Sequence, residues 1–122
     1  WLGEVPAHER HLWFQRVSLC VAPPRYEGYG LTPLEAMSCG AAAVATRTGV
    51  FPTLIEDGQT GYVVDVGDVE ALADRIERCI RDPQALLEMG RRGRQHVVAN
   101  YDIGGEAAGI ERVYARIFDG EL

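Results

Sequence analysis

Two glutamates, Glu27 and Glu35, stand eight residues apart in the stretch "RYEGYGLTPLEAMSCG", residues 25–40. Between them lie a Gly-x-Gly turn and a Thr-Pro pair that opens an apolar helix. Glycines let a ligand approach the main chain closely, and the free N–H groups at a helix N-terminus attract anions, most often phosphate. A carboxylate beside such a site can accept hydrogen bonds from sugar hydroxyls, as acidic residues do with nucleotide ribose.

Structural alternatives stay open for both glutamates. Glu35 falls three residues after Thr32, the expected N-cap, with Pro33 at the first helical position, so T-x-x-E also predicts a capping box. Glu27 is equally compatible with a solvated loop side chain. A functional reason for Glu27 would be a reaction that develops positive charge beside a leaving diphosphate, as glycosyl transfer does in its oxocarbenium-like state.

The elements that must position this stretch alternate between strands and helices. Three continuous apolar runs predict parallel strands that are covered on both faces: residues 18–24, 41–46 and 62–66. Helical patterns cover residues 9–17, 32–39, 69–80 and 83–100, and a final amphipathic helix follows the break "NYDIGG", while residues 47–61 read as a loop. The order predicts an α/β fold, a partial Rossmann-like parallel sheet with a helical C-terminal tail.

The composition narrows the classes of function. Of the 122 residues, 47% are hydrophobic and 25% charged, as in soluble globular proteins, and the net charge of −6 argues against a nucleic-acid partner. No apolar run reaches the ~18 residues of a membrane span, and no signal peptide is visible. The three cysteines are expected to be reduced and buried, and the three histidines form no ligand cluster. We therefore expect a cytoplasmic protein without a metal or a cofactor.

The chain reads as part of something larger. It begins without methionine at "WLGEV", which resembles the end of a strand, and it shows three clear strands, whereas doubly wound sheets usually have about five or six. The strand at 18–24 would then expose one edge. Because such edges pair between chains, we expect dimerisation through it.

The motifs resemble those of a known family. "EGYGLTPLE" looks like the E-x7-E motif of retaining, nucleotide-sugar-dependent glycosyltransferases of the GT-B fold, family 4, also called glycosyl transferases group 1. The blocks "VAPPRYEGYGLTPLEAMSCG" and "AAAVATRTGVFPTLIEDGQTGYVV" follow in the family's order, and the resemblance runs through almost the whole chain. Within the family, the amino-acid sequence of this stretch most resembles that of lipopolysaccharide core mannosyltransferases. Tyr29 stands where phenylalanine is common.

The resemblance implies a role for each matching residue. Glu27 would be the catalytic residue, in contact with donor-sugar hydroxyls near the face where charge develops, and Glu35 would hold the ribose hydroxyls. Val5 would meet the nucleotide base through its backbone. The sugar and the diphosphate would bind to main-chain groups of Tyr29, Gly30, Leu31 and Thr32.

By the same resemblance, residues 1–122 form the C-terminal portion of a nucleotide-sugar-binding domain, and the N-terminal acceptor domain is absent. The first part of the C-terminal domain, with the Arg and Lys that pair with the diphosphate, is absent as well, so the fragment alone is expected to be inactive. The whole enzyme would transfer a hexose from a GDP- or UDP-sugar, with mannose from GDP-mannose as one candidate, to a cell-surface glycan or lipid-linked acceptor. A peripheral contact with the inner face of the membrane fits this activity. The alternative from another class is a non-catalytic nucleotide- or protein-binding α/β module.

Overall fold

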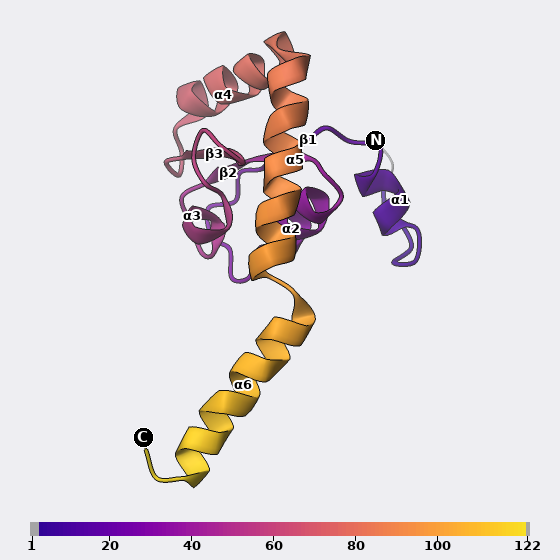
Figure 1. Ribbon diagram of the computed structural model, residues 1–122. Helices are drawn as coiled ribbons and strands as arrows, with labels where there is room; N and C mark the ends of the chain where they lie inside the picture. Colours follow the sequence, from indigo (N-terminus) through magenta and orange to yellow (C-terminus); the bar gives the residue numbers. More distant parts are fainter. Residues whose placement is uncertain (1–2, 122) are drawn as a thin grey trace.

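The computed structural model describes residues 3–121 and shows strands and helices in alternation (Figure 1). The strands are β1 (Leu19–Ala22), β2 (Ala42–Thr46) and β3 (Gly61–Val64), and the helices are α1 (Arg10–Phe14), α2 (Leu31–Ser38), α3 (Phe51–Leu54), α4 (Val69–Arg81), α5 (Pro83–Asn100) and α6 (Ile103–Phe118). The expected α/β fold with a helical C-terminal part is confirmed.

The three strands form one parallel sheet in the order β1-β2-β3. Leu19 pairs with Ala42, and Ala43 pairs with Gly61. All residues of β2 and β3 are buried, whereas β1, at one end of the sheet, is half-buried, with Val21 exposed by 40%. The edge of β1 is therefore open in the described part of the chain, as the sequence predicts.

Helices cover both faces of the sheet, and α5 contributes to both, which explains why the strands are continuously apolar. One core cluster joins α2, α3 and the end of α5 to the sheet: Met37, Ala43, Ala45, Phe51, Leu54, Ile55, Val63 and Val97. On the opposite face Val44, Tyr62 and Cys79 pack with apolar side chains of α4 and the first half of α5. The sheet thus forms the middle layer of the fold.

Helices α4 and α5 begin where the local signals predict. The carboxylate of Asp68 accepts a hydrogen bond from the backbone N–H of Ala71 at 2.8 Å, and that of Asp82 accepts one from Ala85 at 2.9 Å. Both are N-caps, and at the second helix Pro83 occupies the first helical position.

The N-cap of helix α2 lies two residues earlier than the sequence indicates. This N-cap is Gly30, with φ 74°, and no side chain caps the helix, so the predictions of Thr32 as N-cap and of a capping box with Glu35 are wrong. The reason is a contact between distant segments. A Cβ on Gly30 would lie 2.5 Å from the ring of Phe51 and 2.7 Å from Val50, so this tightly packed, left-handed position suits only glycine.

Other elements also differ from what the sequence predicts. The loop expected at 47–61 contains the short helix α3, α1 covers only residues 10–14, and α6 includes the two glycines expected in the break before it. Residues 3–9 form no strand, and the first two residues of "WLGEV" lie outside the described residues. The cysteines are free, but only Cys79 is fully buried, whereas Cys20 and Cys39 are half-buried.

The C-terminal helix α6 points away from the rest of the molecule (Figure 1). It has no buried residue, and a row of its apolar side chains is exposed: Ile103, Ile110, Val113, Tyr114, Ile117 and Phe118. Within residues 3–121, no helix is both long enough and apolar enough to cross a membrane.

Candidate functional site

Two loops that leave the carboxyl edge of the sheet come together. The hydroxyl of Thr46, at the end of β2, donates a 2.6 Å hydrogen bond to the carbonyl of Pro24, which lies in the loop after β1. Gly49, in the loop after β2, approaches so closely that a Cβ on it would lie 2.2 Å from the Glu27 carbonyl oxygen. In open parallel sheets, ligands bind at this carboxyl edge. The junction of the two loops is therefore the candidate site.

Glu27 is fixed by its own loop. Its Oε1 accepts hydrogen bonds from the backbone N–H groups of Gly28, at 3.0 Å, and Gly30, at 3.1 Å. Within residues 3–121, Oε2 accepts no hydrogen bond, and the residue as a whole is half-buried. One oxygen therefore closes the turn, and the other remains available to a ligand.

The N-terminus of α2 follows immediately. Among the described residues, no acceptor meets the backbone N–H groups of Leu31 and Thr32, and Pro33 has no N–H to offer. Leu31 and Thr32 are both exposed residues. Free donors combined with the positive end of the helix dipole favour an anion at this position.

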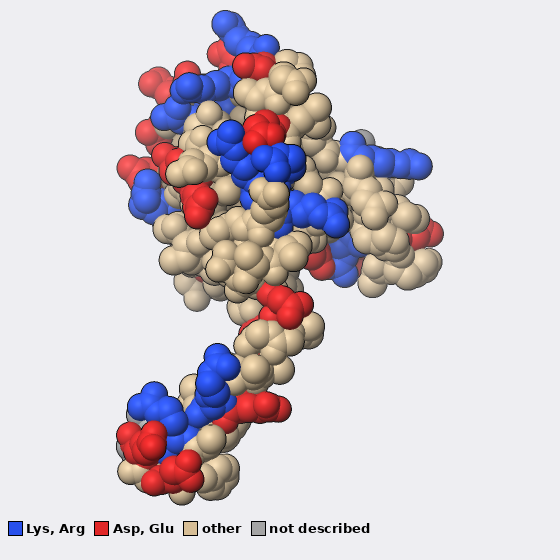
Figure 2. Space-filling view, in the orientation of Figure 1, with Lys and Arg blue, Asp and Glu red and all other residues tan. Residues whose placement is uncertain are grey.

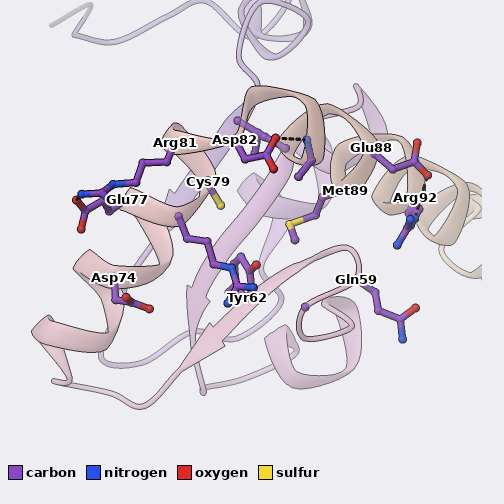
Figure 3. A pocket seen from close by; sticks show the side chains of 14 residues that line it. Gln59, Tyr62, Asp74, Glu77, Cys79, Arg81, Asp82, Glu88, Met89 and Arg92 are labelled. Carbon is purple, nitrogen blue, oxygen red and sulfur yellow. Dashed lines mark hydrogen bonds and ion pairs between the residues drawn. The ribbon is translucent and has the colours of Figure 1, made fainter.

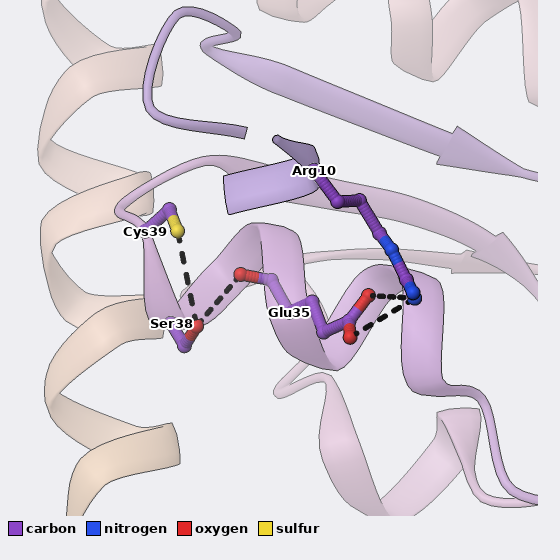
Figure 4. Close-up of polar contacts among 4 residues, drawn as sticks. All are labelled: Arg10, Glu35, Ser38 and Cys39. Atoms are coloured by element: carbon purple, nitrogen blue, oxygen red, sulfur yellow. Dashed lines mark hydrogen bonds and ion pairs between the residues drawn. The ribbon is translucent and has the colours of Figure 1, made fainter. Parts of the chain in front are cut away.

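Glu35 contacts a helix that sequence reasoning did not associate with it. Both of its carboxylate oxygens lie 3.3 Å from Nη1 of Arg10, the first residue of α1, as Figure 4 shows. The backbone carbonyl of Glu35 accepts a 2.7 Å hydrogen bond from the Ser38 hydroxyl one turn later. The carboxylate is consequently not used for capping α2, and it lies on an exposed surface beside α1.

Tyr29 links the same loop to the C-terminal helix. Its hydroxyl donates a 3.2 Å hydrogen bond to Oε1 of Glu106, in the first turn of α6. This hydrogen bond and the negative charge of Glu106 raise the pKa of the Tyr29 hydroxyl, because both favour the protonated form. A phenylalanine at position 29 could not form this link.

The structure places most of the predicted site residues on one loop–helix unit. Glu27, the backbone of residues 29–32 and Glu35 follow one another from the end of the β1 loop into α2. Val5 is half-buried in the irregular segment before α1, and no described hydrogen bond joins it to either glutamate. Arg10 and Glu106 were missed, since nothing in the local sequence signals their distant partners. Gly49 lies in a recognisable turn, but its contact with Glu27 could not be inferred.

A wide hollow lies elsewhere. About 560 Å³ of space opens between α4, α5 and the amino end of β3, over a floor that includes Tyr62, Cys79 and Met89 (Figure 3). Its rim carries both signs of charge, with Glu77 close to Arg81 and Glu88 bound to Arg92. It is on the opposite end of the strand from the two converging loops and offers no single charge for an anionic ligand.

Opposite charges pair on the surface of α5. Basic side chains gather over the middle of α5 in Figure 2, where Glu88 binds both Arg91, at 2.8 Å, and Arg92, at 3.0 Å. These bonds lower the pKa of Glu88 to about 2, with the hydrogen bond from Arg91 as the largest cause. Within the described part of the chain, no group of three or more His, Cys, Asp or Glu side chains is placed to hold a metal ion.

Comparison with known families gives a match over most of the chain. The family model described as "Glycosyl transferases group 1" matches residues 1–96. The lipopolysaccharide core biosynthesis mannosyltransferase LpcC of Rhizobium leguminosarum bv. viciae is 45% identical over 114 residues, which are 93% of this chain and 32% of that protein. The chain thus spans about a third of the length of this relative.

Solved structures share the fold. A sucrose-phosphate synthase from Thermosynechococcus elongatus superposes with a TM-score of 0.89 and 28% identity, over 98% of this chain and 30% of that one. The C-terminal domain of a glycosyl transferase group 1 family protein (LpcC) from Francisella tularensis gives a TM-score of 0.77 and 29% identity, over 84% of this chain and 53% of the other. The fold is that of the C-terminal domain of a GT-B glycosyltransferase.

Proposed function

Because the chain belongs to the glycosyl transferases group 1 family, we propose that it binds the nucleotide-sugar donor of a retaining hexosyltransferase. The observation that carries the proposal is the convergence of the two loops at the carboxyl edge of the sheet, where free N–H donors and two carboxylates follow one another along one loop–helix unit. Few other ligands combine an anion with hydroxyl groups on both sides of it. A nucleoside diphosphate sugar does, with the ribose on one side of the diphosphate and the sugar on the other.

Each group has a role in this proposal. The diphosphate lies at the N-terminus of α2, on the N–H groups of Leu31 and Thr32, where the helix dipole stabilises negative charge. Oε2 of Glu27 accepts from the donor-sugar hydroxyls near the carbon where positive charge develops. Glu35 accepts from the ribose hydroxyls, and the backbone of Val5 meets the base.

Tyr29 and Gly30 complete the proposed site through their main chain. The N–H of Gly30 already donates to Oε1 of Glu27, so a diphosphate that uses this donor must compete with the carboxylate. That competition couples the two ends of the donor, since a phosphate on Gly30 removes one of the two N–H donors from Oε1 of Glu27 and opens an acceptor position on this oxygen for the sugar. The opposite charges of the loop N–H groups and the carboxylate also explain how an acid can stand beside an anion.

The transferred sugar and its acceptor are finer proposals. The named activity of the relative LpcC from Rhizobium leguminosarum favours mannose, hence GDP-mannose as the donor, and a lipopolysaccharide or other cell-surface acceptor. We propose that residues 1–122 act as the C-terminal portion of the donor-binding domain, on the cytoplasmic side of a membrane, and that the chain alone has no transferase activity. A transferase assay with GDP-mannose and a lipid-linked acceptor tests the last point directly.

The test of donor binding is a calorimetric titration of the chain with GDP, UDP, ADP and GDP-mannose. Selective binding of one nucleotide is expected, and Glu35→Ala should weaken it about tenfold or more, because hydrogen bonds to a charged group contribute roughly 1.5–3 kcal/mol. Glu27→Ala should weaken the binding of GDP-mannose more than the binding of GDP. Glu111→Ala, an exposed position on α6, is the matched control. Absence of selective binding would overturn the proposal and favour a non-catalytic, protein-binding module.

The open edge of β1 supports a second, separate proposal, that two copies pair through it. Val21 is exposed by 40%, and β1 hydrogen-bonds to β2 alone within the described sheet. Unprotected edges of this kind pair readily with another strand. Light scattering at micromolar concentration should give the mass of a dimer, and a monodisperse monomer would contradict this.

A further inference from the structure

The contact between Arg10 and Glu35 joins two helices that are far apart in the sequence. A single nitrogen, Nη1 of Arg10, lies 3.3 Å from each oxygen of the Glu35 carboxylate (Figure 4). The two residues are separated by 25 positions, so the contact depends on how α1 packs against α2. Arg10 is also the sole residue that donates a hydrogen bond to the Glu35 carboxylate within residues 3–121.

The exposure of this pair argues against a role in stability alone. The side chains of Arg10 and Glu35 are exposed by 48% and 39%, and ion pairs at such positions add little to folding stability. Helix α1 has five residues, none of them buried, and no side chain caps its N-terminus. The pair does, however, restrict the carboxylate, whose terminal torsion is otherwise broad.

We propose that Arg10 is a positioning residue that orients the Glu35 carboxylate toward the ribose diol of the nucleotide; this inference rests on the proposed function. An ionised carboxylate offers about four acceptor positions on its two oxygens. Arg10 uses one position on each oxygen and leaves the others free, so the carboxylate can keep the arginine and still accept from two neighbouring hydroxyls. Arg10 therefore contributes to the preference for ribose over deoxyribose without touching the sugar itself.

The arrangement makes a prediction that a structural role would not. If Arg10 only held α1 in place, its loss would weaken the binding of ribonucleotides and of deoxyribonucleotides equally. If it orients Glu35, the loss weakens the ribonucleotide selectively, because only the ribonucleotide presents the hydroxyls that Glu35 accepts. The informative quantity is thus the ratio of the dissociation constants for the 2′-deoxynucleotide and the ribonucleotide.

The experiment measures this ratio by calorimetry on the full chain, with the nucleoside diphosphate that binds most tightly and its 2′-deoxy and 3′-deoxy analogues. The variants are Arg10→Gln, Glu35→Gln and the control Arg94→Gln, an exposed arginine on α5. We expect a ratio of about ten or more for the wild-type chain and a two- to fivefold smaller ratio, an order-of-magnitude estimate, in Arg10→Gln. Arg94→Gln should leave the ratio unchanged.

The results separate this inference from the proposed function. A ratio that collapses in Glu35→Gln but is unchanged in Arg10→Gln would overturn the role of Arg10 and leave the ribose site intact. A ratio near one in the wild-type chain, or no nucleotide binding at all, would overturn both. Circular dichroism of Arg10→Gln at the titration temperature establishes that the variant is folded, so a reduced ratio in a folded protein supports the inference.

Discussion

Replacing Gly49 with alanine tests whether the two loops of the candidate site depend on each other. Gly49 has φ 52°, and an added Cβ would stand 2.2 Å from the carbonyl oxygen of Glu27, far inside the 3.0 Å below which real Cβ atoms are essentially never found. The left-handed conformation costs a non-glycine residue about 1–2 kcal/mol. Moving the Glu27 loop by close to an ångström adds a clash cost of about 1–3 kcal/mol. The expected loss of unfolding free energy is therefore about 2–5 kcal/mol.

Urea unfolding followed by circular dichroism measures this loss, and Gly58→Ala supplies the matched control. Gly58 also has a positive φ, 76°, but nothing lies within 4 Å of its added Cβ. Gly58→Ala therefore has the conformational cost of the positive φ without the clash. Gly49→Ala should be the more destabilised variant, with an unchanged urea m-value, and should also bind the nucleotide sugar more weakly. Equal destabilisation of the two variants would refute the close approach of the loops.

Three further predictions concern helices and ionisable groups. Gly90→Ala should destabilise the protein by about 1–3 kcal/mol, since the added Cβ would lie 2.1 Å from a backbone oxygen of the loop before β2. The control Gly93→Ala, whose added Cβ would lie 3.4 Å from its nearest neighbour, should be neutral or stabilising in the same urea assay. Glu106→Gln should lower the pKa of Tyr29 toward its ordinary value in an NMR titration, and an unchanged pKa would mean that the Tyr29–Glu106 bond is absent. Glu88 has its pKa lowered from 4.5 to about 2, so its favourable contribution should be complete above pH 4.5 and disappear as the pH falls through about 2, with an NMR midpoint near 4.5 arguing against the paired geometry.

The parts of the fold that follow local rules could be predicted from the sequence. Apolar runs with no alternation indicated strands covered on both faces, and the β2 and β3 regions are indeed buried throughout. The caps at Asp68 and Asp82 were found because a capping side chain bonds to a backbone group three residues later, within the same few residues of sequence.

The start of α2 could not be predicted, because a contact outside the segment decides it. Thr32, Pro33 and Glu35 together form a good local capping signal. The observed N-cap is Gly30 instead, where the ring of Phe51 and the side chain of Val50 leave no room for a Cβ and the backbone adopts a positive φ. Helix α3, four residues long with a proline inside, was likewise hidden in a segment rich in turn-forming residues.

The candidate site shows the same division. The loop–helix unit with Glu27 and Glu35 was visible in the sequence, because its residues are neighbours along the chain. The hydrogen-bond donors to the two carboxylates differ in their separation along the sequence. The N–H donors to Glu27 come from Gly28 and Gly30, one and three residues onward, whereas the donor to Glu35 comes from Arg10, 25 residues earlier.

This pairing resolves the electrostatic difficulty of two acids beside an anion site. Each carboxylate is in contact with donors of the protein itself: Glu27 with two backbone N–H groups, and Glu35 with the guanidinium of Arg10. The Arg10–Glu35 pair has no net charge, so it repels a nearby diphosphate less than an isolated carboxylate would. The two N–H dipoles at Glu27 offset part of its negative charge at short range. The same donors leave acceptor positions open on both carboxylates. In the proposed donor complex, the two acids can therefore bind hydroxyl groups on either side of the diphosphate without excluding it.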